Sequence, residues 1–218
     1  MKRVAVVGLG TFGASVAEEL AGIGWRVSAL DVDPVRVQRV ESLLREAVVG
    51  DGTDPEVLER IGAAAADAAV VSTGDDVTAS VLIALALEDL GVREIHVKVI
   101  SDLHARILGK IGVTESIFPE HEAAGLLAKR ISNRRILNYQ RLGEGFSAQE
   151  MTVPPGWVGR SLRELELPRA HGISVIAVHD FLTGRMIAIP DPDAPLKDSE
   201  TLLVAGADED LAKVVALR

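Results

Sequence analysis

A glycine-rich turn near the start of the chain constrains the fold more than any other feature of the sequence. A short apolar run leads into Gly8, Gly10 and Gly13, and a helical pattern follows at once. In such a strand–turn–helix the first glycine permits the tight turn, the second lets a pyrophosphate approach the backbone, and the third lets the helix pack on the strand. The helix start, with Thr11 and Phe12, offers N–H groups to an anion. We expect a dinucleotide-type site here; the alternative is a tight turn that holds no ligand.

Apolar runs alternate with helical patterns as far as about residue 134. Hydrophobic residues make up 48% of the 218-residue chain and aromatic residues only 3%, which is typical of parallel sheets covered by helices. Asp33-Pro34 and Asp54-Pro55 each fit a helix N-cap followed by proline at the first helical position. The pattern predicts an α/β fold with a Rossmann-like, doubly wound parallel sheet. Its expected strands are residues 3–8, 26–31, 47–50, 68–73, 95–99 and 115–119, and its expected helices begin at Thr11, Pro34, Pro55, Asp76 and Asp102.

A last helix of this part is expected at about residues 120–133. Ala124, Leu127, Ala128 and Ile131 fall on one face of it at helical spacing. Because little of the chain remains to cover that face, the sequence predicts self-association.

The pattern changes after this helix, where turn residues separate short apolar runs and predict a small α+β C-terminal domain. We place a nucleotide-binding domain at residues 1–138 and the small domain at residues 139–218. A domain of this size buries a small core and is expected to need a partner surface. Its expected strands are residues 147–153, 173–180, 185–190 and 201–206, with short helices near residues 161–167 and 208–215.

The composition excludes several classes of protein. There are no cysteines, so neither a disulfide framework nor a thiolate zinc site can form. The formal net charge of −9 repels polyanions, and no nucleic acid partner is expected. No stretch approaches the roughly 18–20 apolar residues that span a bilayer, and the start of the chain runs directly into a folded motif. We therefore expect a soluble, cytoplasmic chain.

Asp31 ends the second expected strand, about 20 residues after the glycines, where an acid accepts hydrogen bonds from the ribose hydroxyls. With its neighbour Val32 it is placed in the nucleotide site, although a surface turn residue is the alternative. Asp33 is better interpreted as a helix cap. An acid at position 31 disfavours a 2′-phosphate and hence NADP. It does not separate NAD from ATP, ADP or AMP, because all of them carry the same adenosine ribose.

The ends of the next three strands carry further candidates, because the carboxyl ends of parallel strands form the ligand-binding edge of such a sheet. An ordinary loop and helix cap is the alternative for the first two groups, and a solvated side chain is the alternative for the lysine. The candidates are Gly50, Asp51, Gly52 and Thr53 beside the adenine, Ser72, Thr73 and Gly74 beside the ribose and phosphates, and Lys98 within reach of a phosphate.

Catalytic groups are not recognisable in the sequence. A dehydrogenase needs a substrate domain and an acid or base that moves a proton together with the hydride, and neither is evident. The five histidines have neither metal-ligand spacing nor partners in a catalytic triad. The sequence therefore predicts nucleotide binding without predicting turnover.

Several segments resemble, in order, the N-terminal nucleotide-binding domain of the RCK family, the regulators of potassium conductance. The tail from Tyr139 resembles the small C-terminal domain of the same family, so the resemblance covers essentially the whole chain. The architecture is most similar to the cytosolic KtrA- and TrkA-type subunits of bacterial potassium uptake systems. The segments are residues 6–20, 31–37, 48–62, 68–91, 95–99 and 117–131.

The resemblance implies a regulatory protein and not an enzyme. Family members form homodimers that assemble into a ring, commonly an octamer, on an integral membrane potassium transporter subunit of the KtrB or TrkH type. The protein would then lie in the cytoplasm, peripheral to the inner face of the cell membrane, and ATP, ADP or NAD(H) would change the shape of the ring. An NAD-dependent oxidoreductase with a truncated substrate domain and a freestanding nucleotide sensor are the alternatives.

Individual positions carry the resemblance further. The glycines, Asp31, Asp51 and Lys98 match nucleotide positions of the family. Glu120 matches a glutamate that helps hold a divalent cation, Mg²⁺ or Ca²⁺, near the phosphates; the alternative is a helix N-terminal acid favoured by the dipole. Thr11 stands where several KtrA-like members carry an arginine that meets the terminal phosphate, which leaves the preference for ATP over ADP or NADH open. The residues that resemble a cyclic di-AMP site of some relatives are Arg169, Ala170, His179 and Pro190.

Overall fold

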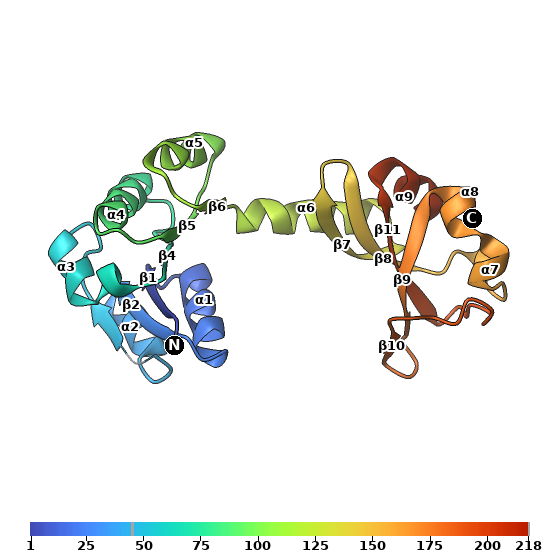
Figure 1. The fold of residues 1–218 in the computed structure, drawn as a ribbon, viewed down its shortest axis with the longest axis horizontal. Coiled ribbons are helices and arrows are strands. Elements are labelled where there is room, and N and C mark those ends of the chain that lie inside the picture. Colours follow the sequence, from blue (N-terminus) through green and yellow to red (C-terminus); the bar gives the residue numbers. More distant parts are fainter. Residues whose placement is uncertain (45, 218) are drawn as a thin grey trace. The chain divides into compact units, whose positions relative to one another are not determined.

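The computed structural model describes residues 1–44 and 46–217, which divide into two compact units (Figure 1). The first unit is Met1–Pro119 and the second is Glu120–Arg218. The helix at Pro119–Ser132 therefore falls almost wholly in the second unit, whereas the domain boundary expected at residues 138/139 assigns that helix to the first domain. The expected boundary stays a prediction.

The first unit is a six-stranded parallel sheet in the order β3-β2-β1-β4-β5-β6. This order reverses between β1 and β4, which is the arrangement of a doubly wound sheet, and the expected Rossmann-like fold is confirmed. All six expected strands are present. They are β1 (Arg3–Val7), β2 (Arg26–Asp31), β3 (Glu46–Val49), β4 (Ala68–Val71), β5 (Glu94–Lys98) and β6 (Glu115–Ile117).

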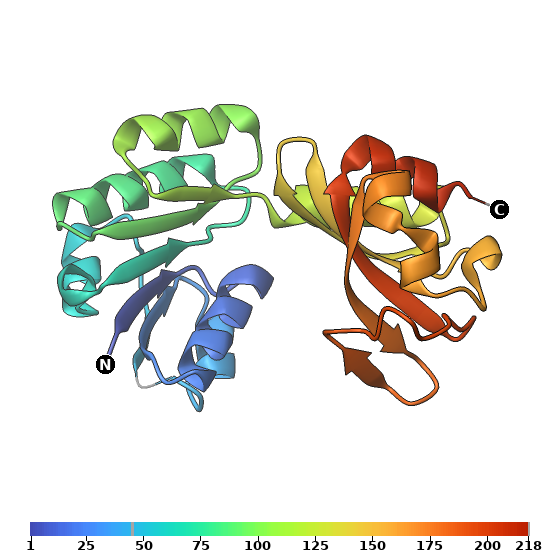
Figure 2. The same ribbon diagram turned by 45° about the vertical axis from the view of Figure 1, so that its right-hand side comes forward.

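Alternate side chains of the central strands enter two separate cores. In β1, Val4 and Val6 pack with α1 and α2, whereas Ala5 and Val7 pack with α3, α4 and α5 on the other face. Figures 1 and 2 show the helices on both sides of the sheet. Burial on both faces explains why the strands are nearly continuous runs of Val, Ile and Ala. The helices are α1 (Thr11–Gly22), α2 (Pro34–Val40), α3 (Pro55–Arg60), α4 (Val77–Asp89) and α5 (Asp102–Ile111), with a 3₁₀ turn at Ala63–Ala65.

Aspartate caps begin two of these helices as the sequence predicts. Asp33 Oδ1 accepts a hydrogen bond from Val35 N at 2.8 Å, and Asp54 Oδ1 accepts one from Glu56 N at 2.9 Å. Each cap is followed by a proline at the first helical position, where its missing N–H costs nothing. Short polar signals thus determine where α2 and α3 start.

The second unit is a five-stranded antiparallel sheet in the order β10-β9-β11-β8-β7, with short helices on one face. Leu167 and Leu211 of these helices pack against Val178 and Leu202 of the sheet. The small α+β C-terminal domain is confirmed, but its first strand and one short helix were not expected. The elements are β7 (Ile136–Gly143), β8 (Phe146–Thr152), β9 (Ile173–Asp180), β10 (Arg185–Ile187), β11 (Glu200–Ala207), α7 (Leu162–Leu165), α8 (Leu167–His171) and α9 (Asp208–Val215), with a 3₁₀ turn at Pro155–Trp157.

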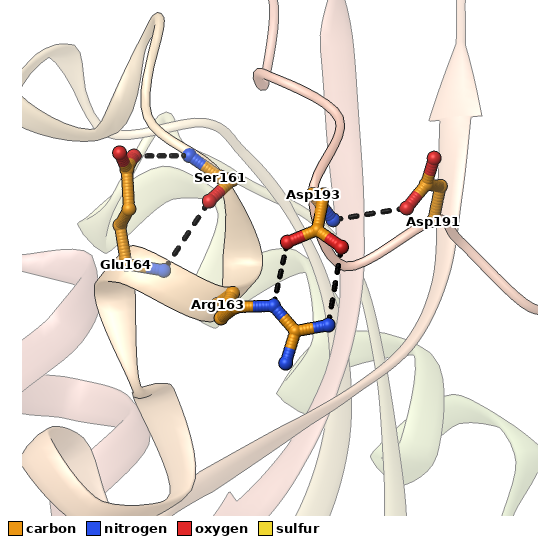
Figure 3. Close-up of polar contacts among 5 residues, drawn as sticks. All are labelled: Ser161, Arg163, Glu164, Asp191 and Asp193. Atoms are coloured by element: carbon orange, nitrogen blue, oxygen red, sulfur yellow. Dashed lines mark hydrogen bonds and ion pairs between the residues drawn. The ribbon is translucent and has the colours of Figure 1, made fainter.

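A bidentate ion pair ties the long segment between β10 and β11 to α7 (Figure 3). Arg163 donates from Nε to Asp193 Oδ1 at 2.5 Å and from Nη2 to Asp193 Oδ2 at 3.1 Å. Asp191 Oδ1 accepts from the backbone N–H of Asp193 at 3.0 Å. A capping box between Ser161 and Glu164 begins α7 at the same place. These contacts position a proline-rich segment that has no regular structure of its own.

Helix α6 (Pro119–Ser132) begins within one residue of its expected start. None of its described side chains is buried, and Leu127 and Ile131 are 55% and 73% exposed. The apolar face that the sequence predicts is thus uncovered within one chain. None of the helices in the described ranges is long and apolar enough to cross a membrane.

His104 is buried in α5, with 2% of its surface exposed. Within residues 1–44 and 46–217 neither of its ring nitrogens has a hydrogen-bond partner. Its helix neighbours Ala105, Leu108 and Ile111 pack against the α3–α5 core. Because burial penalises the charged imidazolium, the pKa of His104 lies below its ordinary value.

We expect the free energy of unfolding to fall as the pH drops below about 6.5, the ordinary histidine pKa. The unfolded chain binds a proton at His104 that the folded chain resists, so stability is lost as the pH falls from 6.5 toward the lowered pKa, by at most about 1.4 kcal/mol per pH unit. Denaturant unfolding at pH 5.5 and 7.5 should show a smaller loss in His104→Leu than in the wild type. An equal loss in the two proteins would contradict this.

Candidate functional site

A cleft of about 250 Å³ lies at the carboxyl ends of β1, β2, β3 and β4. Its floor is apolar, with Val7, Leu30 and Ile83 buried beneath it. Parallel sheets bind ligands at this edge, next to the point where strand order reverses. The predicted residues that line the cleft are Gly8, Asp31, Val32, Gly50, Asp51, Gly52, Thr53, Ser72 and Thr73, and the sequence prediction missed Arg36, Asp76 and Ala79.

Two of the three motif glycines are required by the fold. Gly8 has φ +94°, and a Cβ there would lie 2.1 Å from the carbonyl oxygen of Ser72. A Cβ on Gly13 would lie 1.9 Å from the carbonyl oxygen of Gly8. These contacts are the tight turn and the close helix–strand packing that the motif predicts.

Gly10 differs, because the turn itself does not demand a glycine there. Its φ of −62° suits any residue, and nothing in the described chain lies within 4 Å of where its Cβ would stand. Gly10 is also the N-cap of α1, and as a glycine it makes no side-chain capping hydrogen bond to the first turn of that helix. The bare backbone at Gly10 and the N–H groups of α1 leave room for an anion to approach.

Asp31 connects the glycine turn to the turn after β2. Its Oδ2 accepts a hydrogen bond from Leu9 N at 2.6 Å, and its Oδ1 accepts one from Asp33 N at 2.8 Å. Only 4% of the residue is exposed. The sequence predicts a ribose ligand at this position and does not predict this structural role. Since each carboxylate oxygen has two lone pairs, both oxygens keep one for a further donor.

Arg36 lies on the first turns of α2 and lines the same cleft. Its Nη1 is 3.5 Å from Asp31 Oδ2, and its Nε is 3.5 Å from Asp33 Oδ2. The side chain is 48% exposed. Its place in the first turn of the predicted helix that follows Asp31, five residues after that acid, was the available signal in the sequence.

Asp51 forms a small turn at the rim, after β3. Its Oδ1 accepts from Thr53 N at 2.9 Å and from Thr53 Oγ1 at 2.8 Å. The backbone hydrogen bond, followed by the hydroxyl, stabilises the carboxylate and lowers the pKa of Asp51. Asp76, the cap of α4, adds another carboxylate to the rim. The rim is therefore acidic, and an anionic group is better placed at the start of α1.

The remaining candidates lie along the same edge, and the described residues that line the cleft do not include them. Thr11, Phe12 and Gly13 form the first turn of α1, Gly74 follows β4, and Lys98 ends β5. Their roles stay predictions.

The resemblance to the RCK family implies a divalent cation at Glu120. The described residues contain no cluster of three or more His, Asp or Glu side chains that could hold a metal ion. Glu120 lies in the first turn of α6, in the second unit. A cation held there would need further ligands, such as phosphate oxygens, which Mg²⁺ commonly takes together with one or two carboxylates.

The four residues predicted to bind cyclic di-AMP are divided in the second unit. Arg169 and Ala170 lie on α8, on the helix-covered side of the sheet. His179 alternates with the core residue Val178 and points to the open side, where its Nδ1 is 3.2 Å from Glu150 Oε1. Pro190 follows β10. One chain does not gather the four into one site, and this ligand stays a prediction.

The open side of this sheet is hollowed, with a cavity of about 540 Å³. Ile176 and Met186 line it and are 44% and 53% exposed. Glu150 lies at its edge and accepts a hydrogen bond from Thr201 Oγ1 at 2.8 Å. The second unit thus carries an uncovered apolar face, as the sequence predicts.

The fold and the glycine turn together define a Rossmann-like nucleotide-binding domain followed by a small α+β domain. Residues 4–119 match the TrkA-N domain model and residues 148–217 match the TrkA-C domain model. The chain belongs to the family of TrkA-N and TrkA-C domain proteins. It is 32% identical to Ktr system potassium uptake protein C of Bacillus subtilis, over 97% of this chain and 95% of that protein. It is 31% identical to Ktr system potassium uptake protein A of Vibrio alginolyticus, over the same shares.

Solved structures share the fold. The crystal structure of the GsuK RCK domain matches with a TM-score of 0.54 at 21% identity, over 100% of this chain and 47% of that chain. The Kef CTD of Shewanella denitrificans, solved in an AMP-bound form, matches with a TM-score of 0.52 at 26% identity, over 60% of this chain and 82% of that chain. The expected resemblance to the RCK family is confirmed.

Replacing Gly8 by alanine should destabilise the fold by about 3 kcal/mol or more. The alanine would have to adopt a left-handed backbone conformation, and its Cβ would also collide with the carbonyl oxygen of Ser72. Gly24 is a matched control, since it has φ +88° and nothing in the described chain lies within 4 Å of its Cβ position. Gly24→Ala should cost only about 1–2 kcal/mol, the strain of the left-handed backbone. Equal losses in denaturant unfolding would show that the contact with Ser72 is unimportant.

Proposed function

We propose that this protein is a nucleotide-binding regulatory subunit of a membrane potassium transporter. Its relatives over nearly the full length are named potassium uptake proteins, which supports regulation of transport over an oxidoreductase or a freestanding sensor. The observation that carries nucleotide binding is Gly10, a glycine that the turn does not need and that leaves the start of α1 open beside Asp31. An adenine nucleotide accounts for both features.

The ribose would bind at Asp31, and the phosphates at the glycine turn. The two remaining lone pairs of the Asp31 carboxylate suit the 2′- and 3′-hydroxyls, and the same carboxylate repels a 2′-phosphate. The N–H groups at the start of α1 would hold the phosphates, which would extend toward Lys98. The Kef CTD solved with AMP supports an adenosine ligand, and ATP, ADP and NAD(H) all contain one.

A divalent cation would compensate the phosphate charge. Thr11 supplies no positive charge at the turn, so the charge must be offset by Lys98 and by Mg²⁺ or Ca²⁺ held with Glu120. We expect the cation to matter more in this protein than in relatives with an arginine at that position.

Assembly would couple the nucleotide to the transporter. The uncovered faces of α6 and of the second unit support a homodimer, which would build a ring, commonly an octamer, on an integral membrane subunit at the cytoplasmic side. A ligand shifts the equilibrium between two shapes of such a ring only if it binds one shape more tightly than the other. Cyclic di-AMP would be a second ligand, at Arg169, Ala170, His179 and Pro190 drawn from two copies.

Gly10→Ala should weaken ADP binding about tenfold or more, equivalent to about 1.4 kcal/mol, because a methyl group would stand where the phosphates approach. The fold should be kept, since the position has room for a Cβ. Gly22→Ala, at the other end of the same helix and also with open space, is the control. Calorimetric titration that gives the same ADP affinity for both variants and the wild type would exclude a phosphate site at this turn.

Potassium flux should depend on the nucleotide and on the cation. The ring reconstituted with its membrane subunit in liposomes would be assayed with ATP or ADP, each with and without Mg²⁺ or Ca²⁺. We expect flux to differ between the nucleotides and to respond strongly to the cation, and the Gly10→Ala ring to lose this response. Equal wild-type flux in all conditions would leave a nucleotide-binding scaffold without a gating role.

A further inference from the structure

Arg36 lies beside the carboxylate that the proposed function assigns to the ribose. It lines the cleft, and its guanidinium is 3.5 Å from both Asp31 Oδ2 and Asp33 Oδ2. Ion pairs with two carboxylates, one at Nη1 and one at Nε, restrict where the guanidinium can go. Among the described residues that line the cleft it is the only cation, next to Asp31, Asp51 and Asp76.

The order of the strands determines which end of a nucleotide would meet Arg36. The glycine turn follows β1, Asp31 ends β2, and Asp51 follows β3, with β2 between β1 and β3 in the sheet. If the phosphates lie at the turn after β1 and the ribose at the end of β2, the base lies toward β3. Arg36, on the helix between β2 and β3 in the chain, lies beside the Asp31 carboxylate that would hold the ribose, with its Nη1 3.5 Å from Asp31 Oδ2.

We propose that Arg36 forms one wall of the adenine subsite and stacks its guanidinium plane on the base. This inference rests on the proposed nucleotide site and adds the residue that selects the base. The base is bonded to the ribose carbon next to the 2′-hydroxyl, so a group paired with the ribose-binding carboxylate lies close to it. An arginine plane stacks on aromatic rings, and the carboxylates of Asp31 and Asp33 would hold that plane in place.

The chemistry of the rim favours this role over phosphate binding. A phosphate drawn to Arg36 would also meet Asp31, Asp33 and Asp51, whose negative charges repel it. A neutral aromatic base meets no such repulsion. Since a purine offers more ring surface than a pyrimidine, stacking here would favour adenine nucleotides over uridine nucleotides.

The test is the ratio of affinities for ADP and UDP, measured by calorimetric titration in Arg36→Ala, Arg36→Lys and the wild type. Stacking predicts that Arg36→Ala weakens ADP binding about tenfold and UDP binding much less, so that the preference for ADP falls. Arg36→Lys keeps the charge but not the plane, and it should lose most of the same preference. Arg39→Ala, an exposed arginine on the same helix, should leave both affinities within about twofold.

The outcomes separate the two proposals. If ADP and UDP weaken equally in Arg36→Ala, the residue acts only by positioning Asp31, and the stacking role is overturned. Full ADP preference in Arg36→Lys would also overturn it, because charge alone would then suffice. A wild-type protein that binds neither nucleotide would instead refute the nucleotide site itself.

Discussion

The carboxylate of Asp31 is the interaction on which the cleft depends. It accepts hydrogen bonds from Leu9 in the turn after β1 and from Asp33 in the turn after β2. Both donors are backbone N–H groups, and each gains a hydrogen-bond partner in the buried carboxylate. The carboxylate in turn is stabilised by the two hydrogen bonds that it accepts. The same carboxylate lines the cleft. The shape of the cleft therefore depends on the geometry of the two strand–helix turns that Asp31 connects.

Two glycines of the turn are required by the fold, and the third is not. Gly8 and Gly13 are needed because main-chain atoms approach them more closely than any Cβ would allow. Gly10 meets no such contact, and the proposed phosphate site accounts for a glycine at this open helix start. In the proposed site, the acidic rim formed by Asp31, Asp51 and Asp76 would orient a nucleotide with its phosphates at α1.

The order of elements in the first unit was predictable because each strand is apolar on both faces and each helix begins at a polar or glycine signal. The capping aspartates at positions 33 and 54 illustrate this, since the signal and the contact lie within two or three residues of each other. Strand β7 was missed because its side chains are mostly exposed and mixed in character, and pairing with β8 decides its conformation. Nine of the predicted site residues line the cleft for the same local reason, as they follow or end strands that meet at one edge.

The sequence by itself determined the doubly wound sheet and its glycine turn, since these depend on short-range spacing, and it predicted an anion at that turn and a ribose at Asp31. Only the tertiary structure decided that Asp31 also holds the turn at Leu9, 22 residues away. It also decided that Arg36 faces the cleft and that His179 and Arg169 lie on opposite sides of one sheet. Such features are contacts between segments far apart in the chain, or they depend on which face of a sheet or helix a side chain occupies. Both are decided by how whole helices and strands pack together.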